Sequence, residues 1–260
     1  MTAGTFSAFP ATRLFAMTRV LLVRGMLAGL VAGLLVFALA RWIGEPQVER
    51  AIALETSMDR AKGEAPEPEV VSRAVQRNLG LLAGALVYGT ALGGIFGLVF
   101  AIAHGRIPIA DPRALSATLA AIGCAAIVVV PALKYPANPP AVGNPDTIGI
   151  RTGAFFLLIA FSVAAAVLAV QIELRFHNRL GAWNASLLSA AAFLLITTVI
   201  AHVLPEFNEV PVGFPATLLW QFRVAALAMQ TLQWSAMGLL FGWLTERDFK
   251  TRSALNSSAL

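Results

Sequence analysis

Long apolar runs alternate with polar joints along most of this chain. The runs lie near residues 17–40, 79–103, 115–133, 152–174, 185–204 and 218–244. Each run holds about 20 predominantly apolar residues, which is the length that a helix needs to cross the hydrocarbon core of a bilayer. The pattern therefore predicts an all-α, polytopic transmembrane helix bundle of about six membrane-spanning helices, arranged as a single transmembrane domain over residues 17–247.

The polar joints differ in charge. Arg or Lys occurs in the joints at 104–113 and 175–179, before the first run and after the last, whereas the joints at 43–77, 134–151 and 205–217 together carry most of the acidic residues. Because cytoplasmic segments carry the excess of Lys and Arg, both termini are predicted to be cytoplasmic. The tails would cover 1–16 and 248–260, and the three more acidic joints would be outer loops. His104 and His177, on the inner joints, are expected to be solvated.

The composition excludes a water-soluble domain. Hydrophobic residues make up 58% of the chain and charged residues only 13%, whereas a soluble domain averages roughly 25% charged residues. The net charge of +5 is explained by bases flanking the apolar runs, so we expect the lipid bilayer, and no nucleic acid, as a partner. The single cysteine, Cys124, is expected to be a small buried residue.

The first outer joint contains two segments with a helical pattern. Residues 48–60 read as a short amphipathic helix, and residues 70–78 resume the pattern after the break at GEAPEPE, residues 63–69. The alternative is a solvated loop, because long charged excursions are usually solvated.

Glycines recur every four residues in the first two apolar runs. They are Gly25, Gly29 and Gly33 in the first run and Gly89, Gly93 and Gly97 in the second. Small residues at this spacing let helix backbones approach closely in lipid. We therefore expect the first two helices to pack together, or one of them to contact a partner subunit.

The second outer joint is rich in proline and asparagine. Proline cannot continue a helix, and Gly143 and Asn144 add turn chemistry, yet the joint lacks the composition of a disordered linker. We interpret it as a structured re-entrant or lid-like loop, and the alternative is a connector stiffened by prolines. The candidate loop or gate residues are Lys134, Tyr135, Pro136, Asn138, Pro139, Pro140, Asp146 and Arg151.

A tentative metal site lies where the fifth run ends. His202, Glu206 and Glu209 are close in sequence, and imidazole with carboxylates suits a borderline divalent cation such as Co²⁺, Ni²⁺ or Zn²⁺. The alternative is a group of interfacial polar residues. No nucleophile, zinc-protease or phosphate-binding motif occurs in the sequence, so we predict no enzyme and no permanently bound cofactor.

Three bases flank the outer ends of the apolar runs. They are Lys134, Arg151 and Arg223, with Asp146 as a candidate partner for one of them. A basic ring can attract anions, and the alternative is that these side chains extend to the interface from helix ends. Gln230 and Gln233 lie inside the last run and are expected to bond a neighbouring helix or to line a path.

Taken together, these segments give a chain that resembles the CbtA family, proposed cobalt transporter subunits of bacteria. The longest and compositionally least usual segment is LKYPANPPAVGNPDTIGIRT. The segments that carry the resemblance are Arg24–Gly33, Gly44–Pro46, Val70–Gly84, Leu133–Thr152, Leu180–Leu188 and Asn208–Arg223.

The resemblance implies a multi-pass protein of the bacterial cytoplasmic (inner) membrane that moves Co²⁺ for corrinoid (cobalamin) synthesis. It also implies a small single-helix partner, CbtB, and a homo-oligomer is a further expectation. Family members carry histidines in the first outer loop, whereas ETSMDRAKGEAPEPE, residues 55–69, has none. The alternative function is a non-transporting membrane scaffold or assembly partner for another membrane protein.

Overall fold

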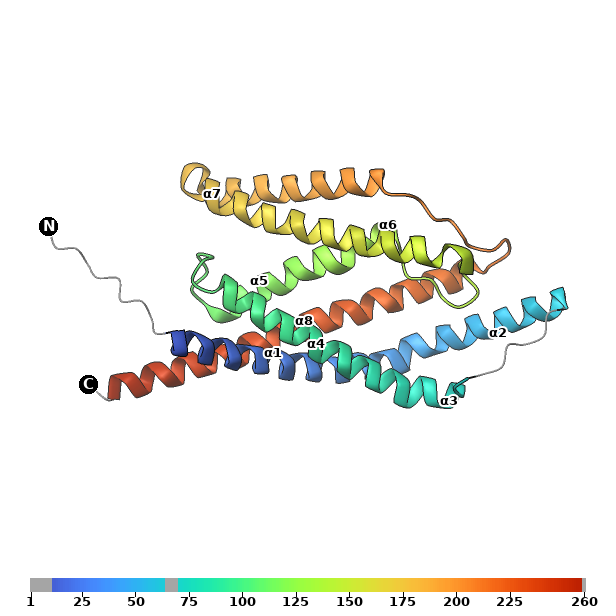
Figure 1. Cartoon of the computed structure of the whole chain (residues 1–260), viewed down its shortest axis with the longest axis horizontal. Helices are drawn as coiled ribbons and strands as arrows, with labels where there is room; N and C mark the ends of the chain where they lie inside the picture. Colours follow the sequence, from blue (N-terminus) through green and yellow to red (C-terminus); the bar gives the residue numbers. More distant parts are fainter. Residues whose placement is uncertain (1–10, 64–69, 259–260) are drawn as a thin grey trace.

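The regular structure of the protein is helical. The computed structural model describes residues 11–63 and 70–258, and no strand occurs within these two ranges. The helices are α1 (Ala11–Leu39), α2 (Glu45–Lys62), α3 (Arg73–Val75), α4 (Leu81–Ala103), α5 (Pro112–Cys124), α6 (Val130–Lys134), α7 (Ile148–Val203) and α8 (Ala216–Ser258). Single π-helical turns join α1 to α2, α3 to α4 and α5 to α6, so each of these pairs is one continuous helix (Figure 1).

Five described helical segments are long and apolar enough to cross a bilayer. They are Met17–Lys62, Arg73–Ala103, Pro112–Lys134, Pro145–Val203 and Ala216–Lys250. The prediction of about six is therefore not confirmed as a count, because the runs at 152–174 and 185–204 belong to one segment, α7. That segment reverses at Gly181, where φ is 75° and ψ is 161°, a backbone conformation that glycine adopts without steric cost. Its two arms lie side by side in Figure 1.

The first outer joint is largely helical. α2 runs to Lys62 and ends at Gly63 in a left-handed conformation. Glu45 forms an ion pair with Arg73, and Glu49 forms one with Arg77 at 2.8 Å. These pairs attach α2 to the helix that begins at Arg73. Most of the GEAPEPE break between the two helices lies outside the described residues. The solvated-loop alternative is thus wrong for residues 45–62.

The helices also extend beyond the predicted spans at both ends of the chain. α1 begins at Ala11, within the expected tail over residues 1–16, whose first ten residues lie outside the described ranges. α8 continues through the expected tail at 248–260 as far as Ser258. Near this end Arg24 of α1 contacts Asp248 of α8 at 2.9 Å, and Arg113 of α5 pairs with Glu246. These ion pairs connect α8 to two neighbouring helices.

The two glycine series face each other along an antiparallel contact between α1 and α4. A Cβ atom built on Gly29 would lie 2.0 Å from the carbonyl oxygen of Gly89, and one on Gly25 would lie 2.0 Å from that of Gly93. Cβ atoms added to Gly33 and Gly97 would lie 2.5 and 2.4 Å from carbonyl oxygens of the opposite helix. No side chain fits in these positions, so the backbones of α1 and α4 touch directly.

α8 packs against this pair and links it to α5. Phe241 makes edge-on ring contacts with Phe96 and Phe100 of α4, with centroids 5.3 and 4.9 Å apart. On its other side α8 presents Gly238, whose carbonyl accepts a hydrogen bond from the buried hydroxyl of Ser116 at 2.6 Å. The main hydrophobic core therefore lies between α1, α4, α5 and α8.

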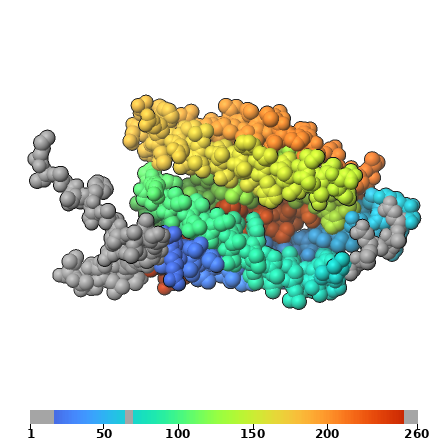
Figure 2. All heavy atoms as spheres, in the orientation of Figure 1, coloured from blue at the N-terminus to red at the C-terminus, as the bar shows by residue number. Residues whose placement is uncertain are grey.

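α7 forms a separate layer over this core. Figure 1 shows both arms on the side of α5 that faces away from α1. Figure 2 shows a hollow between the α7 layer and the α1–α4 layer, with α8 visible at its floor. Many large apolar side chains of α7 are exposed, including Phe156 at 62% and Leu195 at 65%. An all-helical element with such a surface requires a lipid environment.

The α1–α4 contact makes a prediction about stability. Gly29→Ala places a methyl group where no space exists, and overpacking of this kind typically costs about 1–3 kcal/mol. Gly84→Ala is the matched control, because a Cβ atom added to Gly84 of α4 would have no neighbour from another helix within 4 Å. Alanine there should be neutral or stabilise the helix by up to about 1 kcal/mol. Thermal unfolding of both variants in detergent measures the difference. Equal midpoints for the two variants would contradict the close contact.

Candidate functional site

A cavity of about 470 Å³ lies at the end of the bundle where α6 ends, α7 begins and α8 begins. Its floor and walls combine aromatic rings with charged and amide side chains. The charged and polar lining residues are Lys134, Tyr135, Asn138, Arg151, Thr152, Asn208, Glu209 and Arg223. Of the predicted loop residues, Pro136 also lines the cavity. Pro139, in the same loop, is buried.

The proline-rich joint is ordered by hydrogen bonds to three other parts of the chain. The Tyr135 hydroxyl donates to the carbonyl of Pro205 at 2.7 Å. The backbone N–H of Ala141, which has a left-handed φ of 67° after two prolines, donates to Glu55 of α2 at 3.2 Å. Arg223 of α8 donates to the Asn138 side chain at 3.0 Å. The joint is therefore a structured loop that lies over the end of the bundle.

Glu209 holds this loop to the joint between α7 and α8. Its carboxylate accepts hydrogen bonds from the backbone N–H of Asn144 at 2.7 Å and from the Thr147 hydroxyl at 2.5 Å, and Arg151 lies 3.3 Å away. The Glu209 side chain is only 17% exposed. Glu209, which the sequence suggested as a metal ligand, thus acts in the structure as the hydrogen-bond acceptor that holds the proline-rich loop to the joint between α7 and α8.

Lys134 and Arg223, the other bases of the cavity, do not pair with Asp146, the partner expected from the sequence. Lys134 pairs with Glu206 at 3.2 Å, whereas Arg223 donates to Asn138 and to the carbonyl of Ala137. Asp146 is exposed and has no ion pair within the described part of the chain, so the structure does not bring it together with any of these bases. Among the lining residues three cations face one carboxylate, and the cavity is electropositive.

The surroundings of the loop shift the pKa values of Glu209 and Tyr135. Donation from Thr147 and Asn144, with the nearby charge of Arg151, lowers the pKa of Glu209 below its ordinary value of 4.5, so its carboxylate stays ionised. Burial, with a smaller contribution from the charge of Glu206, raises the pKa of Tyr135. Both shifts favour the states in which Glu209 accepts and Tyr135 donates.

His202 does not join the acids that were expected to share a metal with it. It is exposed near the end of α7, where its Nδ1 contacts the carbonyl of Thr198 at 3.1 Å. Glu206 and Glu209 are engaged with Lys134 and with the loop. Within the residues that the structure describes, no three His, Cys, Asp or Glu side chains are grouped closely enough to hold a metal. The helix ends before Pro205, between His202 and the acids, which separates them.

A second cavity, of about 420 Å³, lies near the opposite end of the bundle between α5 and the two arms of α7. Glu173 and His177 line it, with Nδ1 of His177 3.2 Å from Oε1 of Glu173. The expectation that His104 and His177 are merely solvated holds only in part, since His177 is half-buried against Glu173 and His104 stacks on Phe100 with centroids 5.5 Å apart. The spacing of Glu173 and His177, one helical turn, was the signal in the sequence for this pair.

One face of the first arm of α7 connects the two cavities. Side chains three or four residues apart lie on one face of a helix. The residues on this face line the first cavity, then a packed segment, then the second cavity. In order they are Arg151, Phe155, Leu158, Ser162, Ala166, Val170, Glu173 and His177. Leu158 and Ser162 are fully buried, and the Ser162 hydroxyl has no hydrogen-bond partner within the described residues.

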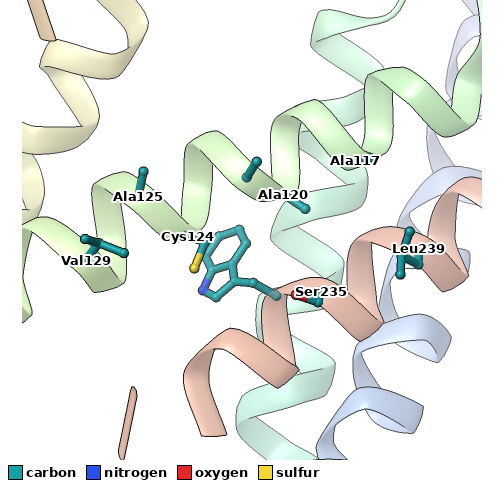
Figure 3. A pocket seen from close by; sticks show the side chains of 9 residues that line it. Ala117, Ala120, Cys124, Ala125, Val129, Ser235 and Leu239 are labelled. Carbon is teal, nitrogen blue, oxygen red and sulfur yellow. The ribbon is translucent and has the colours of Figure 1, made fainter. Parts of the chain in front are cut away.

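A third pocket, of about 360 Å³, is apolar and lies between α5 and α8. Figure 3 shows Ala117, Ala120, Cys124 and Ala125 of α5 and the turn after it opposite Ser235 and Leu239 of α8. Cys124 is partly exposed to this pocket, so the expectation of a buried cysteine holds only in part.

The two amides inside α8 differ in their surroundings. Gln230 accepts a hydrogen bond from the Tyr88 hydroxyl of α4 at 3.4 Å, as expected for an interhelical contact. Gln233 is buried, with 2% of its surface exposed. The expectation of a bond to a neighbouring helix is therefore confirmed for Gln230.

The helices define the class of protein: a polytopic helical membrane protein, with cavities that contain charged side chains near both ends of one helix interface. A family model for CbtA, described as probable cobalt transporter subunit, matches residues 18–246. The chain belongs to the CbtA family, and it is a probable cobalt transporter subunit. Comparison with curated proteins gave no match, and comparison with solved structures gave none either.

The role of Glu209 as a fastener predicts a local effect of mutation. Glu209→Gln removes the charge that accepts from Asn144 and Thr147 and attracts Arg151, so the loop should open more often and residues 135–147 should exchange their amide hydrogens about tenfold faster. Glu206→Gln is the control, because the Glu206 side chain is 89% exposed. Equal exchange in the two variants would show that Glu209 does not hold the loop.

The lowered pKa of Glu209 predicts how the docked loop responds to acid. A carboxyl group whose pKa is lower in the docked state stabilises docking above its ordinary pKa, and this stabilisation is lost as the pH falls through the lowered value. Protection of the Asn144 amide should therefore be constant near neutral pH and should decrease below pH 4.5. Protection factors measured by hydrogen exchange check this. Glu209→Gln should lack the decrease, and an identical decrease in that variant would assign the effect to another group.

Proposed function

We propose that this chain is the membrane-embedded subunit of a transporter for divalent transition metals, with Co²⁺ as the cargo that supplies corrinoid synthesis. The match to the CbtA family over residues 18–246 carries the proposal, because it covers nearly the whole membrane domain. A small single-helix CbtB-like subunit is the proposed partner, and the bacterial cytoplasmic membrane is the proposed location. Cobalt is the transported substrate in this proposal, not a resident cofactor.

The proposed topology has six crossings with both termini in the cytoplasm. α7 reverses at Gly181 and each arm contains one apolar run long enough to span the bilayer. The start of α1, the end of α8 and the reversal of α7 lie at one end of the bundle in Figure 1. Four bases lie at this end, in the helices or in the joint after α4: Arg106, Arg113, Arg175 and Arg179. By the positive-inside rule they support a cytoplasmic assignment for this end.

The proposed path follows the face of α7 that borders both cavities. In the proposed topology the first cavity is the outer cavity and would receive the ion, and the second is the inner cavity and would release it. Leu158 and Ser162 would close the path between them in the present conformation. Secondary transporters commonly move one helical unit against another around such a path. α7 suits this motion because none of its described residues belongs to the main hydrophobic core between α1, α4, α5 and α8.

The outer loop would control access to the outer cavity. It covers the cavity and is fastened by a few polar contacts, chiefly through Glu209 and Arg223. Contacts of this kind can open without unfolding the helices. A loop that acts as a gate must therefore exchange between fastened and released states during transport.

Uptake of radioactive cobalt tests the proposal. Cells that lack other cobalt importers should take up the ion above the empty-vector level when they express this chain with its small partner, and competing Ni²⁺ should reduce the uptake. Background uptake with and without the partner, at normal abundance of the chain in the membrane, would reject cobalt import.

A double variant tests the outer acids within the same assay. Glu206→Ala with Glu209→Ala leaves Lys134 and Arg151 without their carboxylates, so the cavity becomes more positive and repels the ion. Uptake should fall about tenfold, because a charged cleft changes the local concentration of an ion by at least this factor. Asp59→Ala removes an acid of α2 that lies away from the cavity lining and should leave uptake unchanged. Unchanged uptake in the double variant would remove the outer acids from the path.

The scaffold alternative has a distinct outcome. The glycine series that would have offered a surface to a partner is occupied by the contact between α1 and α4. A scaffold should still bind its partner in a pull-down assay while giving background cobalt uptake. This combination would favour the scaffold over the transporter.

A further inference from the structure

We propose that Glu173 and His177 form a binding site for a divalent transition-metal ion in the inner cavity between α5 and α7. The site lies apart from the outer acids, near the end of the bundle that holds the Gly181 reversal. It rests on the proposed function and deepens it, since it gives the cargo a binding position on the release side of the path.

The charge of the inner cavity suits a cation. Its charged or titratable lining residues within the described chain are Glu173 and His177, and the nearby Arg175 and Arg179 are exposed and do not line it. With a neutral imidazole the cavity carries a negative charge. The outer cavity, in contrast, sets three bases against one carboxylate. A divalent ion is therefore stabilised in the inner cavity and repelled by the lining of the outer one.

The geometry of the pair suits metal coordination. Nδ1 of His177 and Oε1 of Glu173 are 3.2 Å apart. Bonds of about 2.1 Å from one ion to both atoms give this separation at a ligand–metal–ligand angle of about 100°. Imidazole and carboxylate together are ligands that Co²⁺, Ni²⁺ and Zn²⁺ accept. An ion bound between the two atoms would take the place of their direct contact.

The remaining carboxylate oxygen marks the site as incomplete. Oε2 of Glu173 is buried and has no hydrogen-bond partner in the described structure. A buried carboxylate oxygen without a partner is costly, and a bound cation would compensate it. The rest of the coordination shell would be water, for which a cavity of about 420 Å³ has room. Thr118, Ser186 and Ser189 provide the nearby hydroxyl groups that could hold such waters.

The competing explanation is a simple ion pair one helical turn apart on α7. An ion pair needs no metal, and its loss would leave cobalt binding unaffected. A metal site instead requires both side chains for binding. Direct measurement of Co²⁺ binding to the purified full chain therefore separates the two explanations.

The detergent-solubilised chain is titrated with Co²⁺, and bound Co²⁺ is measured by equilibrium dialysis and by its visible absorption. Glu173→Gln and His177→Gln should each raise the Kd about tenfold or more, since even outer-shell changes cost metal sites about 10–100-fold. Asp59→Asn and His202→Gln change an acid and a histidine that line neither cavity, so they are the matched controls and should leave the Kd unchanged. A wild-type chain without Co²⁺ binding, or an unchanged Kd in Glu173→Gln, would overturn the site.

A second measurement covers the case in which a variant fails to fold. His177 of the wild-type chain is 39% exposed in its side chain and can react with diethyl pyrocarbonate. Co²⁺ at about ten times its Kd should slow modification of His177 about tenfold, because only the unoccupied fraction reacts. His202 should react at its usual rate. Equal modification of His177 with and without Co²⁺ would overturn the proposal.

The outcomes distinguish this site from the proposed transport. Cobalt uptake with an unchanged Kd in Glu173→Gln would reject the inner site and keep the transporter. Background uptake by a wild-type chain whose Co²⁺ binding depends on Glu173 would reject import and keep the site.

Discussion

The direct contact between the backbones of α1 and α4 is the constraint on which the rest of the structure depends. Glycine at each crossing position lets the two helices approach to distances that a single methyl group would prevent. In lipid, where apolar surfaces gain little by meeting one another, such close packing is a main source of helix association. The resulting flat pair presents Phe96 and Phe100 to Phe241, which fixes α8 in the centre of the molecule.

α8 transmits this arrangement to both ends of the bundle. Toward the Gly181 end it carries Glu246 and Asp248, which pair with Arg113 of α5 and Arg24 of α1. At the other end it carries Arg223, which holds the proline-rich loop through Asn138. The same helix thus supports the tightly packed core and one wall of the outer cavity. α7 lies outside this core, and its reversal at Gly181 brings its two arms together as one layer.

The two cavities on α7 have opposite charge, and this contrast bears on how a cation would pass. The outer cavity is lined by bases that are partly neutralised by Glu206 and Glu209, whereas Glu173 dominates the inner one. On the proposed path, an ion arriving through the outer cavity would depend on those two acids to offset the bases, and an ion that had passed Leu158 and Ser162 would meet a carboxylate. Glu209 both fastens the proline-rich loop and contributes the carboxylate of the cavity lining, so on the proposed path loop opening and ion access would be coupled.

The sequence by itself determined the class of the protein, whereas the tertiary structure decided which side chains meet. The length and hydrophobicity of the runs require membrane-spanning helices, the glycine spacing of four residues requires one helix face of small residues, and the segments at Leu133–Thr152 and Asn208–Arg223 identify the family. These properties are local, because they follow from residues close together along the chain.

Glu209, in contrast, binds a loop more than 60 residues away in sequence, and the end of α7 separates His202 from the acids beside it. The positive φ of Gly181 folds α7 back, which brings Ser186 and Ser189 to the cavity that Glu173 lines. Helical periodicity placed Glu173 and His177 on one face, but only the packing of α5 against both arms of α7 buries them in part, because burial depends on contacts between distant segments.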